Sequence, residues 1–175
     1  KDPYFPISYP SNYSGELAQA LGFFHTQGMP ADTWAVNEGR LSEWAHMEQL
    51  NTILDENVRL LDHELSQFKE GLFFFYLGTP DVIQHMFWQY IDPQHPLYQK
   101  DAPEEFRSAI AEWYRKMDRI LGRVLDSVGM QDMVMVLSDH GFGTFRRAAH
   151  INSWLKDHGY LSLKDPSAKS GGELL

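Results

Sequence analysis

The chain has 175 residues, of which 43% are hydrophobic and 14% aromatic, a composition typical of a globular domain with a substantial core. Its formal net charge of -9 argues against a partner that is a nucleic-acid polymer, because phosphate backbones are held by clustered Lys and Arg. With no cysteine, a disulfide framework and a thiolate metal site are excluded, so any metal ligand must be His, Asp, Glu or a hydroxyl.

Neither end of the sequence has the features of a natural terminus. The start, Lys1-Asp2-Pro3, is neither a signal peptide nor an initiator methionine, and the last residues follow a Ser/Lys/Gly-rich stretch typical of a loop. No apolar run approaches the roughly 18 residues of a membrane span. We therefore expect a fragment without a membrane-spanning segment. The cellular compartment stays open, with the cytoplasm favoured.

The N-terminal third predicts a loop-rich start and then a long helix. Residues 1–13 are rich in Pro, Tyr and Ser and should lead into a short helix over 15–26, whereas 28–40 should form a loop. Ser42 is a good N-cap for the next helix. Over 43–68 apolar residues recur every three or four positions, which predicts a long amphipathic helix.

Two continuous apolar runs, 72–77 and 133–137, predict strands that are buried on both faces. Three further helices are predicted, over 79–90, 106–128 and 151–157. Because buried strands alternate with covering helices, the predicted fold class is α/β, a three-layer sandwich with a mainly parallel sheet.

Polar residues follow the first predicted strand. Thr79 suits an N-cap and Pro80 the first helical position, so a helix should begin there. Asp81 and His85 are then four residues apart on one helix face, where a carboxylate and an imidazole can bind one metal ion. The alternative is that Asp81 only complements the helix dipole and that His85 is a surface or core histidine.

A second polar group, Ser138-Asp139-His140-Gly141, follows the second predicted strand. An Asp-His pair at the edge of a core is difficult to explain as packing, because both side chains are costly to bury. A solvated turn is the alternative. Ligands in α/β folds collect beyond the carboxyl ends of strands, so Asp81 and Asp139 are candidates for one site.

The same residues carry a resemblance to a known family. Five side chains resemble the metal-binding pattern of the alkaline phosphatase superfamily, in its type I phosphodiesterase/nucleotide pyrophosphatase branch: Asp81, His85, Asp139, His140 and His150. The flanking sequence resembles an uncharacterised prokaryotic group of that branch in five short segments: 74–76, 84–88, 92–93, 138–143 and 154–155. The resemblance covers most of residues 10–162. It implies one partial catalytic domain over 1–175, whose N-terminal strand and C-terminal remainder are missing.

The resemblance also implies two divalent ions as cofactors, with zinc expected first and manganese as the alternative. One ion would be bound by Asp81, His85 and a further His, and the other by Asp139, His140, an earlier Asp and a hydroxyl nucleophile. His150 is favoured as the further His over one beyond residue 175. The nucleophile itself is expected upstream of residue 1.

The expected function is metal-dependent hydrolysis of a small phosphate monoester or diester through a covalent intermediate. Arg146 and Arg147 are candidates to bind the substrate phosphate by bidentate hydrogen bonds, although a solvated basic loop is the favoured interpretation of the pair. Two alternatives stay open: a non-catalytic fragment or pseudoenzyme that serves as a binding module, and a phosphomutase or sulfatase on the same scaffold. The oligomeric state also stays open.

The other histidines are given structural roles. His46 and His63 are assigned to the exposed surface of the long helix over 43–68. Trp88, Trp113 and Trp154 are assigned to apolar helix faces in the core.

Overall fold

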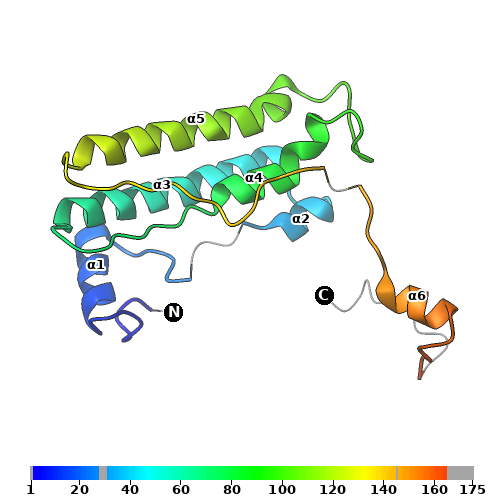
Figure 1. Ribbon diagram of the computed structural model, residues 1–175, viewed down its shortest axis with the longest axis horizontal. Coiled ribbons are helices and arrows are strands. Elements are labelled where there is room, and N and C mark those ends of the chain that lie inside the picture. Colours follow the sequence, from blue (N-terminus) through cyan, green and yellow to red (C-terminus); the bar gives the residue numbers. More distant parts are fainter. Residues whose placement is uncertain (1, 28–30, 145, 165–175) are drawn as a thin grey trace. The chain divides into compact units, whose positions relative to one another are not determined.

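The computed structural model describes residues 2–27, 31–144 and 146–164. The chain divides into two compact units, Lys1–Thr144 and Phe145–Leu175, and each is considered by itself (Figure 1). Residue 1 and the Ser/Lys/Gly-rich end at 165–175, which the sequence predicts to be part of a loop, lie outside the described residues. The helices are α1 (Tyr13–Leu21), α2 (Thr33–Asn37), α3 (Glu43–Gln67), α4 (Thr79–Phe87), the 3-10 helix η1 (Trp88–Tyr90), α5 (Glu104–Ser127) and α6 (Ile151–Asp157).

The predicted helices are confirmed, although the ends of some of them differ from the prediction. The helix predicted over 43–68 is α3, and the Ser42 side chain caps it by accepting a hydrogen bond of 3.2 Å from the Ala45 N–H. The helix predicted over 106–128 is α5, which begins two residues earlier at Glu104. The first helix ends sooner than predicted, because Gly22 takes a φ of 81° and interrupts the helical backbone.

The predicted α/β fold class, a three-layer sandwich with a mainly parallel sheet, is wrong for the described residues. Throughout 2–27, 31–144 and 146–164 there is no strand, and the runs 72–77 and 133–137 form no ladder with any neighbour. An apolar run predicts burial, but a strand also needs a second segment to accept and donate its backbone hydrogen bonds. The described structure supplies no such second segment for either run.

The two runs also expose apolar side chains that the sequence predicted to be buried. In 72–77 the side chains alternate: Phe73, Phe75 and Leu77 pack against the helical core, whereas Leu72 is 91% exposed. All five side chains of 133–137 are exposed. One face of the first run therefore serves as a cover for the helices, and the second run contributes nothing to their core.

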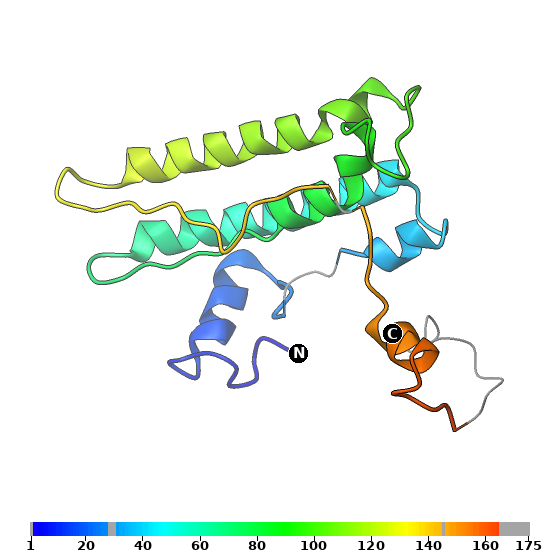
Figure 2. The ribbon, with the colours of Figure 1, turned by 45° about the vertical axis from the view of Figure 1, so that its right-hand side comes forward.

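The core of the first unit lies between α3, α4 and α5, which Figures 1 and 2 show alongside one another. Each helix contributes the apolar stripe that its periodicity predicts. The buried members of this core include Leu50 and Leu54 of α3, Ile83 and Phe87 of α4, and Phe106 and Trp113 of α5. Because α4 is covered on two sides, its position is determined by tertiary packing rather than by its short length.

A buried hydrogen bond fixes the start of α4. Gly78 is the N-cap and Thr79 is the first helical residue, one position away from the predicted assignment, so that Pro80 falls at the second. The Thr79 hydroxyl is buried and accepts a hydrogen bond of 3.1 Å from the Trp113 indole N–H on α5. This bond holds the turn of α4 that carries Asp81.

No helix in the described ranges combines the length and the apolar content needed to cross a bilayer.

Candidate metal site

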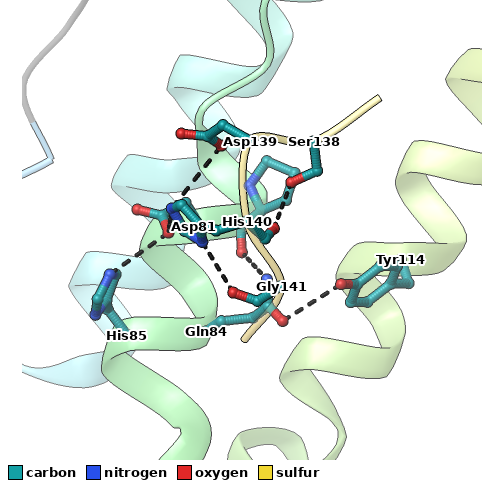
Figure 3. A network of polar contacts seen from close by, with 9 residues as sticks. Asp81, Gln84, His85, Tyr114, Ser138, Asp139, His140 and Gly141 are labelled. Atoms are coloured by element: carbon teal, nitrogen blue, oxygen red, sulfur yellow. Dashed lines mark hydrogen bonds and ion pairs between the residues drawn. The ribbon is translucent and has the colours of Figure 1, made fainter. Parts of the chain in front are cut away.

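Asp81 and His85 lie one turn apart on α4 and approach each other closely. Asp81 Oδ1 is 3.4 Å from His85 Nε2 (Figure 3). Although 40% of the Asp81 side chain is exposed, its Oδ1 atom is inaccessible to solvent and has no hydrogen-bond partner among the described residues. A buried carboxylate oxygen without a donor is unfavourable in a folded protein, so this atom needs an explanation.

The segment 138–144 brings a second imidazole to the same oxygen. His140 Nε2 is 3.8 Å from Asp81 Oδ1 and 3.9 Å from Asp139 Oδ1. Figure 3 shows this segment crossing α4, with Asp81 between the two histidines. The Ser138 hydroxyl donates a hydrogen bond of 2.6 Å to the His140 carbonyl and closes the turn. Four of the five predicted ligands therefore lie together, although they come from segments more than fifty residues apart.

The His140 ring is oriented by its own backbone. Its Nδ1 lies 2.8 Å from the Gly141 carbonyl oxygen, which can only accept, so Nδ1 must be the nitrogen that donates. In the neutral ring the lone pair then resides on Nε2, the atom that faces Asp81. The Gly141 carbonyl, followed by the Asp139 and Asp81 carboxylates, raises the pKa of His140 above its usual value. These contacts favour the protonated ring when no cation is present.

Segment 138–144 is attached to the end of α4 and to η1 by a second set of contacts. The Trp88 indole N–H donates a hydrogen bond of 2.8 Å to the Thr144 hydroxyl, which in turn donates to the Asp92 carboxylate. The Phe142 ring packs edge-on against His85 with centroids 4.8 Å apart, and its centroid lies 5.1 Å from that of Trp88. Trp88 is therefore more than the core residue that the sequence predicts, since its polar atom holds this segment in place.

The donor spacing is compatible with part of a metal site. Two ligands of one tetrahedral zinc ion, each about 2.0–2.1 Å from it, lie about 3.3 Å apart. The 3.4 Å between Asp81 Oδ1 and His85 Nε2 fits that spacing and is long for a hydrogen bond. Even so, no group of three or more His, Asp or Glu side chains in 2–27, 31–144 and 146–164 is placed to hold an ion. The geometry therefore supports a pair of ligands and not a complete site.

Three predicted site residues belong to the second unit. His150 is the residue immediately before α6, and its side chain makes no capping hydrogen bond there. Arg146 and Arg147 precede it, and all three side chains are exposed. The predicted link between His150 and the Asp81–His85 pair on α4 stays a prediction.

A pocket of about 420 Å³ adjoins the Asp81–His85 pair, and the sequence did not predict it. Its lining comes from α2 and α4: Thr33, Asn37, Asp81, Val82, His85 and Met86. The sequence predicted a loop over 28–40, yet residues 33–37 form α2, capped by the Asp32 carboxylate, which accepts from the Ala35 N–H at 2.8 Å. Asp32, a residue type favoured at the N-cap, was the available signal for this helix.

The family of the chain follows from comparison with known proteins. The family model for type I phosphodiesterase/nucleotide pyrophosphatase matches residues 4–173, and the chain belongs to that family. The resemblance that the sequence motifs suggested is thereby confirmed, and the domain is one of a family of phosphate-ester hydrolases. No curated protein and no solved structure matches the chain.

Proposed function

We propose that this chain supplies the metal-binding part of a hydrolase that acts on small phosphate monoesters or diesters. The observation that supports this most directly is Asp81 Oδ1, a buried and unbonded carboxylate oxygen with the Nε2 atoms of His85 and His140 within 3.8 Å. A divalent cation is the partner whose chemistry suits a carboxylate and neutral imidazoles together.

The proposed ligands divide into two sets. Asp81 and His85 would bind one ion together with His150 or with a later histidine, and Asp139 and His140 would contribute to the other. An Asp and a hydroxyl nucleophile from outside residues 1–175 complete the second set. Zinc is the ion that suits this donor set best, and manganese is the alternative.

The reaction proceeds in two steps on the proposed nucleophile. Its oxygen forms a bond to phosphorus while the bond to the substrate alcohol breaks, the proton of the hydroxyl passes to the departing alcohol, and water then releases the phosphate. Two divalent ions, when bound, would neutralise charge on the phosphate and lower the pKa of the attacking hydroxyl. The Gly141 carbonyl keeps Nε2 of the His140 ring directed at the site, and Arg146 with Arg147 are candidates to hold the phosphate.

The test uses the full-length natural protein, a 4-nitrophenyl phosphate monoester and diester, and zinc or manganese. His85→Ala and Asp139→Ala should each lower kcat/KM by at least about 100-fold, because loss of even an outer partner of a metal ligand costs about 10- to 100-fold. His63→Ala on α3 is the control, since His63 does not line the site. Turnover that is unchanged in both variants rejects the assignment.

An experiment on the isolated chain, residues 1–175, distinguishes this proposal from the main alternative, a non-catalytic binding module. That alternative is favoured by the incomplete set of ligands in the part of the chain that the structure describes. We expect the isolated chain to bind zinc weakly and to show no turnover, whereas the full-length protein should turn over both esters. Turnover by the isolated chain would place the nucleophile within it, and an inactive full-length protein that binds zinc would favour the binding module. A phosphomutase would transfer the phosphate instead of releasing it, and a sulfatase would release sulfate from a sulfate ester, so the products distinguish both from the proposed hydrolase.

A further inference from the structure

The pocket beside the Asp81–His85 pair has two polar walls. Thr33 and Asn37 are four residues apart and share one face of α2, and Asp81 and His85 share one face of α4 in the same way. Both pairs line a single pocket of about 420 Å³. The volume is large enough for a small organic group beside a phosphate.

The wall formed by α2 differs in chemistry from the wall formed by α4. The Thr33 hydroxyl and the Asn37 amide are uncharged, and in the described residues neither side chain has a hydrogen-bond partner. Both groups can donate and accept. Val82 and Met86 add apolar surface, and among the residues that the structure describes no Lys or Arg lines the pocket. A ligand group that fits here is therefore uncharged, carries hydroxyls and has an apolar face.

The α2 wall is held in place by contacts that leave Thr33 and Asn37 available. The Asp32 N–H donates a hydrogen bond of 2.8 Å to the Gln49 side-chain oxygen on α3. Val36, on another face of α2, packs against the hydrophobic core. A short helix fixed at its start and along one face can present the remaining face to a ligand.

We propose that Thr33 and Asn37 determine substrate specificity by binding the hydroxyl groups of an uncharged, sugar-like or polyol alcohol esterified to phosphate. This inference rests on the proposed function for the position of the phosphate, beside Asp81 and His85. It predicts a preference for esters of hydroxylated alcohols over esters whose second substituent is a further phosphate, because none of the described residues that line the pocket is cationic.

The test measures binding by calorimetry to the zinc-loaded full-length protein. Two phosphonates, in which carbon replaces the ester oxygen so that no hydrolysis occurs, carry either a glucose ring or a cyclohexyl ring of similar size. Asn37→Ala and the isosteric Thr33→Val should each weaken binding of the glucose phosphonate by about 3- to 10-fold, the effect of one hydrogen bond. Binding of the cyclohexyl phosphonate should not change. Asn57→Ala on α3, which does not line the pocket, is the control.

Each outcome decides the inference. Selective loss of glucose phosphonate binding in Asn37→Ala and Thr33→Val supports it. Equal weakening of both ligands, no weakening of either, or no binding of the glucose phosphonate by the natural protein overturns it. Turnover is scored separately: selective binding without hydrolysis of the 4-nitrophenyl esters would reject the proposed hydrolase while keeping the role of α2.

Discussion

Thr79→Val removes the hydroxyl that holds the start of α4, and with it the anchor of the turn that carries Asp81. Thr79 is only 3% exposed, and its Oγ1 accepts the Trp113 indole N–H at 3.1 Å. Valine has nearly the shape of threonine, so little cavity is created. The variant instead leaves a buried indole N–H without an acceptor, which costs about 1–3 kcal/mol of unfolding free energy.

A double-mutant cycle separates the hydrogen bond from packing. Trp113→Phe loses the N–H and much side-chain volume, and we expect a cost of about 2–4 kcal/mol. In that background the Thr79 hydroxyl has lost its indole donor, so Thr79→Val should cost close to nothing more. The expected coupling energy between Thr79 and Trp113 is therefore about 1–3 kcal/mol, the full cost of Thr79→Val in the natural protein.

The assay is urea unfolding followed by far-UV circular dichroism, which reports on the helices and does not depend on Trp113 as a fluorophore. The matched control is Thr52→Val on α3, whose hydroxyl donates only to the Glu48 carbonyl of its own helix. That substitution should change the unfolding free energy by no more than about 0.5 kcal/mol. If Thr79→Val is no more destabilising than Thr52→Val, the buried bond does not hold α4 as described.

Two further predictions concern other buried or bridging side chains. His46 is fully buried, and neither of its ring nitrogens has a hydrogen-bond partner among the described residues. Burial lowers the pKa of His46 from 6.5, although the nearby Gln49, Asp32 and Glu43 side chains offset part of that shift. The unfolded chain therefore binds the proton more readily than the folded one, and the free energy of unfolding falls as the pH drops below 6.5. His46→Leu should remove that loss and add about 1 kcal/mol to the free energy of unfolding at neutral pH. Urea unfolding on both sides of pH 6.5 measures both effects, with His63→Leu as the control. Trp88→Phe removes the donor to Thr144 and should weaken zinc binding by about 10-fold in a chelator competition, whereas Trp44→Phe should not; equal affinities would show that the bridge does not position the site.

The helical part of the fold was predictable because its signal is local. In α3 and α5 the apolar residues recur at the helical period over many turns, and the predicted ends fall within two residues of those observed. The strands were mispredicted because a strand depends on a partner segment elsewhere in the chain. The run at 72–77 contains the required apolar residues, yet only one face of it meets the core.

The candidate site was predictable only as far as its motifs are local. Asp81 with His85, and Asp139 with His140, are visible from spacing alone, and the structure brings the two motifs together. The burial of His46 was not visible, because its position on α3 says nothing about which neighbours cover it. The pocket wall formed by α2 was invisible for the same reason, since it exists only where α2 meets α4.

The contacts around Asp81 connect this tertiary arrangement to function. An isolated helix could carry Asp81 and His85, but the Oδ1 atom becomes inaccessible only in the folded unit, where segment 138–144 brings His140 close to it. That segment is fixed by Thr144 and Phe142, residues that contribute no ligand themselves. An unbonded buried oxygen opposes folding, and the cation of the proposed function would offset that cost. In the proposed function the partly exposed side chains of Asp81, His85 and His140 provide the ligands, while the buried Thr79–Trp113 hydrogen bond holds the turn of α4 that positions Asp81.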